Sequence, residues 1–108
     1  MTDKIVVLVT CGSAREARKI ARPVVAKRLA ACANIFSGRV ESVYRWKGKV
    51  ESAREVLMVI KSSRKRFPAL EQEIRRWHSY EVPEIIALNI ERGSRGYLEW
   101  IAESVRPS

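Results

Sequence analysis

The sequence predicts an α+β fold in which helices cover one face of an antiparallel sheet. Two β-branched segments, residues 5–9 and 56–60, are apolar at every position, as in strands that are buried on both faces. Residues 13–29 and 62–77 carry apolar side chains at helical spacing, and each segment follows one of these strands. No linker rich in proline, glycine or serine divides the 108 residues, so we expect one domain over residues 1–108.

The first strand, residues 5–9, ends at the turn sequence Thr10-Cys11-Gly12, and the first helix follows it. Ser13 is expected to cap that helix, because Glu16 three residues later completes a capping box. Pro23 lies inside the helix and removes one backbone hydrogen bond, so we expect a local bend there.

A long hairpin comes next. Residues 32–46 form its first strand, with a bend at Ser37-Gly38, and the turn Lys47-Gly48-Lys49 leads into a second strand over residues 50–60. The second helix is expected to be capped by Ser62-Ser63.

The remaining elements complete the alternation. Residues 78–84 form a loop, residues 85–90 form the last strand, and a short terminal helix starts at Gly93-Ser94. The order β-α-β-β-α-β with one extra helix is that of the ferredoxin-like fold. Right-handed crossover connections then give the strand order 4-1-3-2.

The predicted sheet has more apolar surface than one chain can cover. The terminal helix is too short to cover a second face, and the hairpin of residues 32–60 is longer than the other strands. We therefore expect its end to pair with a neighbouring subunit; the alternative is a mobile arm on a chain whose terminal helix covers more of the sheet. The residues expected at the subunit interface are Tyr44, Arg45, Trp46 and Val50.

Composition narrows the classes of function. There are 21 Lys and Arg residues against 12 Asp and Glu residues, and the net charge of +9 permits a polyanionic partner. Specific RNA binding by this fold requires aromatic side chains on the central strands, which residues 5–9 and 50–60 lack. No apolar run could span a membrane and the N-terminus lacks a signal-peptide pattern, so we expect no membrane partner and a cytoplasmic location.

Three residues that can bind a metal are predicted at one end of the sheet. The first strand ends at Cys11, the second helix ends at His78, and Glu81 follows in the next loop. Thiolate, imidazole and carboxylate groups are ligands of copper and zinc. The structural alternatives are that His78 caps the last carbonyls of the helix and that Cys11 is a buried thiol. Cys32 is predicted about 20 Å away at the other end, beyond disulfide reach.

No catalytic arrangement is visible. The chain has one histidine, no Gly-x-Ser-x-Gly sequence and no phosphate-binding P-loop. Residues 38–45 are faintly similar to the phosphate-binding stretch of acylphosphatases, but in that family the stretch follows the first strand. Here it lies in the second strand, so we do not expect an enzyme.

Motifs in four places, taken together, resemble one family. They are residues 7–11 (VLVTC), 29–35 (LAACANI), 42–50 (SVYRWKGKV) and 78–86 (HSYEVPEII), in the same order over nearly the whole chain. With these motifs the sequence resembles the divalent-cation tolerance protein family, CutA. The resemblance implies a ferredoxin-like subunit in a homotrimer similar to the PII signalling proteins. It also implies a role in tolerance of divalent metals, copper above all, and no established catalysis.

The resemblance extends to one site residue. A proposed copper ligand of the family matches His78, whereas a histidine and a cysteine of some members fall on Trp77 and Val9. We therefore expect His78 to bind copper or another divalent cation, with Glu81 and Cys11 as partners and no tightly bound cofactor. The expected function is a trimeric metal-binding or signal-sensing module. The alternatives are a PII-like sensor of a small anionic metabolite and, less favoured, an acylphosphatase-like hydrolase.

Overall fold

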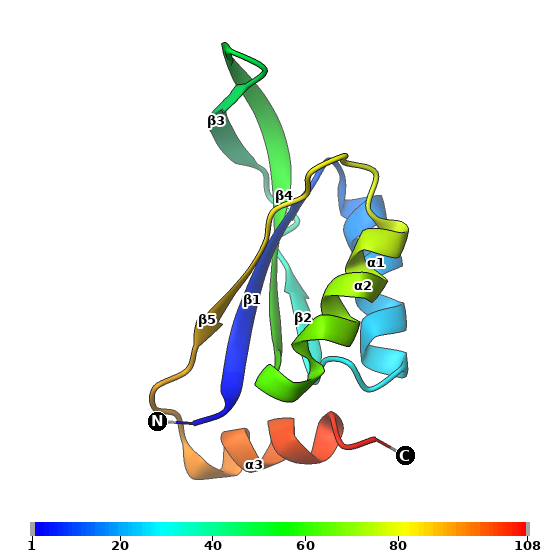
Figure 1. Ribbon diagram of the computed structural model, residues 1–108, viewed down its shortest axis with the longest axis vertical. Coiled ribbons are helices and arrows are strands. Elements are labelled where there is room, and N and C mark those ends of the chain that lie inside the picture. Colours follow the sequence, from blue (N-terminus) through cyan, green and yellow to red (C-terminus); the bar gives the residue numbers. More distant parts are fainter. Residues whose placement is uncertain (1, 108) are drawn as a thin grey trace.

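The computed structural model describes residues 2–107, and its elements alternate between strands and helices (Figure 1). A short 3-10 helix, Arg64–Arg66, precedes the second α-helix. The strands are β1 (Lys4–Cys11), β2 (Cys32–Ile35), β3 (Val40–Trp46), β4 (Lys49–Ser63) and β5 (Ile85–Asn89). The helices are α1 (Ala14–Ala26), α2 (Phe67–Trp77) and α3 (Arg95–Ser104).

The sheet is antiparallel, with β1 and β4 at its centre. Its strand order is β2-β4-β1-β5, and β3 pairs with the outer half of β4. The predicted order 4-1-3-2 is confirmed, because β2 and β3 are the two halves of the predicted strand 32–46, interrupted at residues 36–39. In the register of β1 with β4, Val7 lies opposite Ile60 and Cys11 lies opposite Val56.

Helix α1 begins as predicted and ends early. The Ser13 hydroxyl accepts a hydrogen bond from the Glu16 backbone at 3.1 Å, which is one half of the capping box. Pro23 lies inside the helix, and the chain leaves the helix at Arg28, whose φ of 59° is left-handed. The backbone amides of the next two residues both bond to the Val24 carbonyl. The helix therefore stops at Ala26, before the predicted residue 29.

The expectation that Ser62 and Ser63 cap α2 is wrong. Both serines are buried at the end of β4, and the Ser62 hydroxyl donates to the Leu29 carbonyl at 2.6 Å instead of capping a helix. The α-helix begins at Phe67, with Pro68 in its first turn, where a missing backbone donor costs nothing.

Helices α1 and α2 cover only one face of the sheet (Figure 1). The side chains that β1 directs to this face, from Ile5 to Cys11, alternate with less buried residues. Helix α3 lies across the end of the sheet, where Ile101 and Val105 build a small separate cluster with Ala31. The opposite face therefore stays uncovered within one chain.

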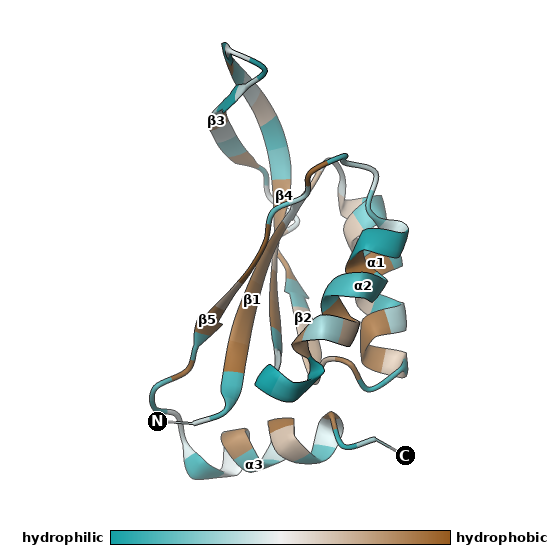
Figure 2. Ribbon diagram, viewed as in Figure 1, coloured by the Kyte–Doolittle hydropathy of each residue, from teal (hydrophilic) through white to brown (hydrophobic). Residues whose placement is uncertain are grey.

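Figure 2 shows that apolar residues predominate along β1 and β5. On the edge strand β5, Ile86 is 47% exposed and Leu88 is 52% exposed. The β3–β4 hairpin extends beyond the rest of the sheet (Figure 1), and its turn has positive φ at Lys47 and Gly48, as hairpin turns of this type require. Within residues 2–107, no helix has the length and apolar character needed to cross a membrane.

Candidate functional site

Three side chains that can bind a metal meet where β1 leaves the sheet. Cys11 is the last residue of β1, Glu16 lies in the first turn of α1, and His78 follows the last residue of α2. One ligand atom from each residue lies within 4.8 Å of the other two. The structure thus brings Cys11 and His78 together, and it adds Glu16 where the sequence suggested Glu81.

His78 uses both ring nitrogens. Its Nε2 lies 2.8 Å from the Thr10 carbonyl oxygen, and its Nδ1 accepts a hydrogen bond from the Tyr80 backbone amide at 3.1 Å. Because Nδ1 is the acceptor, the proton of the neutral ring is on Nε2 and is donated to Thr10. The ring also packs against Tyr80, with centroids 4.7 Å apart. His78 therefore holds the loop of residues 78–84 onto β1.

Cys11 is a buried thiol. Its side chain is inaccessible to solvent, and its sulfur lies 3.7 Å from the Met58 sulfur. Burial, followed by the nearby negative charges of Glu16 and Glu55, raises the pKa of the Cys11 thiol to about 12. A protonated thiol is a poor nucleophile and a poor ligand. This geometry therefore favours the alternative that Cys11 is a buried structural thiol.

Glu16 holds the backbone on both sides of the cluster. Its carboxylate accepts a hydrogen bond from the Ser79 amide at 2.8 Å and a longer one from the Gly12 amide at 3.4 Å. The capping-box pattern correctly placed Glu16 at the helix start but gave no sign that its carboxylate reaches the loop after α2. The sequence reasoning therefore missed Glu16 as a member of the cluster.

Glu81 lies in a different place, a groove of about 750 Å³ between the β3–β4 hairpin and the loop of residues 78–84. We call this the hairpin groove. Its lining contains three glutamates and three aromatic residues: Glu55, Glu81, Glu84, Tyr44, Trp46 and Tyr80. Among the described residues, those that line this groove include no lysine or arginine.

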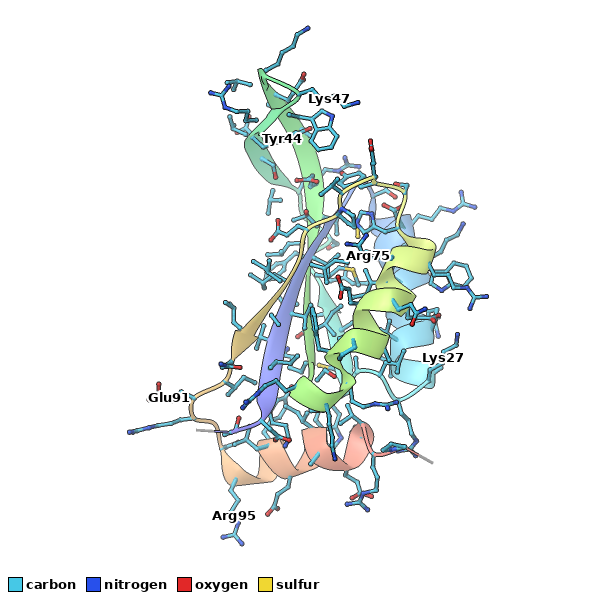
Figure 3. The ribbon with its side chains drawn as sticks, viewed as in Figure 1. Lys27, Tyr44, Lys47, Arg75, Glu91 and Arg95 are labelled. Carbon is cyan, nitrogen blue, oxygen red and sulfur yellow. The ribbon has the colours of Figure 1, made fainter. Side chains whose placement is uncertain are left out.

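The predicted interface residues lie on the projecting hairpin. Tyr44 and Trp46 are partly exposed at 43% and 38%, Val50 is 68% exposed, and Arg45 is also exposed. Tyr44 and Lys47 are labelled on the hairpin in Figure 3. This exposure of aromatic and apolar side chains on one arm is consistent with an interface between subunits.

Comparison with known proteins identifies the family. The family model described as "CutA1 divalent ion tolerance protein" matches residues 5–104 of the chain. The chain belongs to the CutA1 family. CutA1 proteins are non-catalytic divalent-cation tolerance proteins, so the family prediction and the expectation that the chain is not an enzyme are confirmed.

Individual CutA relatives agree along nearly the whole chain. The divalent-cation tolerance protein CutA of Thermus thermophilus is 46% identical over 99 residues, which cover 92% of this chain and 95% of the relative. Its solved structure superposes with a TM-score of 0.92 at 43% identity, covering 95% of this chain and 99% of that one.

Two further CutA relatives differ in chain length or in the compartment that their names give. Protein CutA of Mus musculus is 50% identical over 93 residues, which cover 86% of this chain, yet the chain spans only about half of the mouse protein. A structure titled "Periplasmic divalent cation tolerance protein CutA", from Archaeoglobus fulgidus, is 39% identical with a TM-score of 0.91, covering 95% of this chain and 99% of that one.

The CutA1 family is described by tolerance of divalent ions, which raises the question of whether Cys11, Glu16 and His78 can bind one. Its donor types suit copper and zinc, but each donor has another bond in this structure. His78 uses both ring nitrogens, the Cys11 thiol is protonated, and the Glu16 carboxylate accepts two backbone amides. The three residues therefore do not fit a resident metal cofactor.

Proposed function

We propose that the chain forms a homotrimer that takes up a divalent cation, copper in particular, as an exchangeable ligand in divalent-cation tolerance. The observation that carries this proposal is the convergence of three ligand atoms from Cys11, Glu16 and His78 within 4.8 Å. Family membership supports the tolerance role. The sulfur and nitrogen ligands favour copper and zinc over magnesium or calcium, which prefer oxygen.

The hydrogen bonds that the cluster already makes lower its affinity for a divalent ion. A bound ion must displace the proton of Cys11. If it is held by Nε2 of His78, the ring proton must move from Nε2 to Nδ1, which breaks both the bond to the Thr10 carbonyl and the bond from the Tyr80 amide. Each displaced hydrogen bond costs about 1 kcal/mol, and each displaced proton makes affinity depend on pH. We therefore expect modest affinity and rapid exchange, as a tolerance function requires of a site that loads only when metal is in excess.

The trimer is supported by the surface that one chain leaves uncovered. Edge strand β5 exposes Ile86 and Leu88, and the hairpin exposes Val43 and Val50. An apolar edge strand with free backbone groups is an unstable feature of a lone subunit, whereas pairing with a neighbour's hairpin would cover it. Sedimentation equilibrium should give three times the chain mass of 12.4 kDa.

For the compartment of the protein we keep the prediction made from the sequence, which is the cytoplasm. The Archaeoglobus fulgidus relative is titled periplasmic, and a relative from Arabidopsis thaliana is named chloroplastic. Fractionation of the native host would decide between these settings. Metal uptake as proposed needs only that Cys11 stays reduced.

The metal proposal is tested by titrating Cu²⁺ and Zn²⁺ against a competing chromophoric chelator. We expect His78→Ala to weaken affinity by about tenfold or more, because it removes the imidazole ligand. Tyr80→Phe is the matched control: it alters the same loop and removes the 2.8 Å bond to Glu55 but leaves all three donors. Equal affinities of wild type and His78→Ala would overturn the proposal.

A further inference from the structure

Most of the chain's positive charge lies on one side of the molecule. Residues 14–28, which contain α1, and residues 64–77, which contain α2, together hold eleven lysines and arginines against three glutamates. They account for +8 of the net charge of +9, since the other residues hold ten basic and nine acidic side chains. Because α1 and α2 pack against each other over the same face of the sheet (Figure 1), their exposed basic residues form one surface. We call this surface the basic helical face.

On α1 the basic residues form a stripe that points to solvent. Residues three and four positions apart share one side of a helix. This spacing joins Arg15, Arg18, Lys19 and Arg22. All four are exposed, and the buried residues of α1 lie on the opposite side of the helix. Within residues 2–107 none of the four forms an ion pair, so carboxylates of this chain do not neutralise the stripe.

The three glutamates of these two segments already have other partners. Glu16 accepts hydrogen bonds from two backbone amides, and Glu73 is buried and accepts from Lys27 at 2.9 Å. Glu71 lies 3.5 Å from Arg75, one turn further along α2. In the described part of the chain, carboxylates therefore pair with two of the eleven cations, and the basic helical face keeps a positive potential that attracts polyanions.

An exposed aromatic ring lies within this face at the end of α2. Trp77 is 42% exposed, and its indole nitrogen donates to Glu73 at 2.9 Å, the same carboxylate that Lys27 of α1 contacts. The Arg76 guanidinium carbon lies 5.7 Å from the centre of the Trp77 ring. An anchored ring among cations is an arrangement on which unpaired nucleic-acid bases stack. The bases of a duplex are stacked on one another and cannot use it.

The kind of cation favours a chain of phosphates over a lipid surface. Eight of the eleven cations are arginines, whose planar guanidinium groups bind phosphate oxygens through two parallel hydrogen bonds. A surface helix binds a membrane by inserting its apolar side into the lipid. The apolar sides of α1 and α2 are buried against the sheet, so neither helix can do this.

From these observations we propose that the basic helical face binds single-stranded nucleic acid without sequence preference. Phosphates of the strand pair with the stripe of α1 and with Arg76, and one base stacks on Trp77. This face is across the sheet from the uncovered face and away from the hairpin (Figure 1), so the proposed trimer leaves it accessible. The inference goes beyond the proposed metal uptake.

The test is fluorescence anisotropy of the assembled protein with a fluorescein-labelled oligouridylate over a series of salt concentrations. We expect saturable binding whose affinity falls as the salt concentration rises. The double variant Arg18→Gln/Arg22→Gln should bind about tenfold or more weakly at low salt. Its plot of log affinity against log salt should be shallower by about 1.4, because each lost phosphate contact removes about 0.7 from the slope.

The matched control is the double variant Arg92→Gln/Arg95→Gln. It removes the same charge from exposed residues outside α1 and α2, and Figure 3 shows Arg95 at the end of the molecule opposite the hairpin. The control should bind oligouridylate with nearly the affinity of the wild type. An effect confined to Arg18→Gln/Arg22→Gln separates contacts on the basic helical face from a general effect of net charge.

A second comparison tests the stacked base. Trp77→Leu should bind oligouridylate about fivefold or more weakly, because it removes the ring, and should bind an RNA duplex of the same length like the wild type. Trp100→Leu is the control, since Trp100 is 44% exposed but lies on α3. Circular dichroism checks that both variants are folded.

Three outcomes would overturn the proposal. The first is no saturable binding of oligouridylate by the wild type. The second is an equal loss of affinity in Arg18→Gln/Arg22→Gln and Arg92→Gln/Arg95→Gln, which would show that net charge alone drives binding. The third is tighter binding to the RNA duplex or to phosphatidylserine vesicles than to oligouridylate, which would assign the face to a different partner.

Discussion

The Nε2 atom of His78 lies 2.8 Å from the carbonyl oxygen of Thr10, and this bond ties the loop after α2 to the end of β1. The bond places the only histidine of the chain beside Cys11 and Glu16. It also orients Tyr80, whose amide bonds to the other ring nitrogen and whose hydroxyl reaches Glu55. One imidazole thus connects the cluster of Cys11, Glu16 and His78 with the hairpin groove.

Replacing His78 should destabilise the fold as well as weaken metal uptake. His78→Ala leaves the Thr10 carbonyl and the Tyr80 amide without their partner, for an expected loss of about 1–3 kcal/mol in the free energy of unfolding. Urea denaturation monitored by circular dichroism measures this loss. Ser79→Ala, an exposed neighbour that binds Glu16 through its backbone, should unfold like the wild type. Unchanged stability of His78→Ala would show that the two bonds are not formed in solution.

Glu73 should make stability depend on pH. Hydrogen bonds from the Trp77 indole and the Lys27 ammonium, both 2.9 Å long, hold the pKa of the Glu73 carboxyl below its ordinary value of 4.5. Because the folded pKa is depressed, this stabilisation is fully present above pH 4.5 and is lost as the pH falls through the folded pKa.

Glu73→Gln tests this dependence. The variant should be less stable than the wild type at pH 7, and the difference should narrow towards pH 3, as measured by urea denaturation at both values. Glu99→Gln, an exposed change on α3, serves as control. A stability difference for Glu73→Gln that stays constant between pH 7 and pH 3 would contradict the role of the ionised carboxylate.

Cys11 should resist alkylation in the native protein. Its pKa of about 12 leaves almost no thiolate at pH 8, and its side chain is inaccessible. Iodoacetamide followed by peptide mass spectrometry should therefore modify Cys11 only after unfolding in urea. Alkylation of native Cys11 at the rate found in urea would show that the thiol is exposed or ionised.

The trimer should depend on the apolar residues of the hairpin. A charge introduced by Val50→Glu should weaken association by about tenfold or more, because the carboxylate would be desolvated against a neighbouring subunit. Glu51→Gln, the adjacent exposed position, is the control. Sedimentation velocity at several concentrations measures both, and a fully associated Val50→Glu protein would remove the hairpin from the interface.

The sequence allowed much of the fold to be predicted, because its signals are local. The apolar runs of β1 and β4 and the capping box at Ser13 each depend on residues within one element. The expected serine cap of α2 was wrong because the Ser62 hydroxyl donates to the Leu29 carbonyl, a contact between residues far apart in the chain. Nothing in the local sequence shows such a contact.

The candidate site was predicted less completely for the same reason. Topology alone brings Cys11 and His78 to one end of the sheet, so their proximity could be foreseen. The Glu16 carboxylate and the buried Glu55 depend on contacts with Ser79 and Tyr80, whose loop geometry has no sequence signal. The one available clue was that Glu16 and the loop after α2 lie at the same end of the predicted sheet.

Proton release on Zn²⁺ binding is the most direct measurement of the proposed metal uptake. Titration calorimetry in two buffers of different ionisation enthalpy counts the protons released for each ion bound. Because the Cys11 thiol is protonated at neutral pH, binding through its sulfur should release about one proton in the wild type and none in Cys11→Ala. Binding of Zn²⁺ with the same proton release in both proteins would show that the cluster of Cys11, Glu16 and His78 is not where the ion is held.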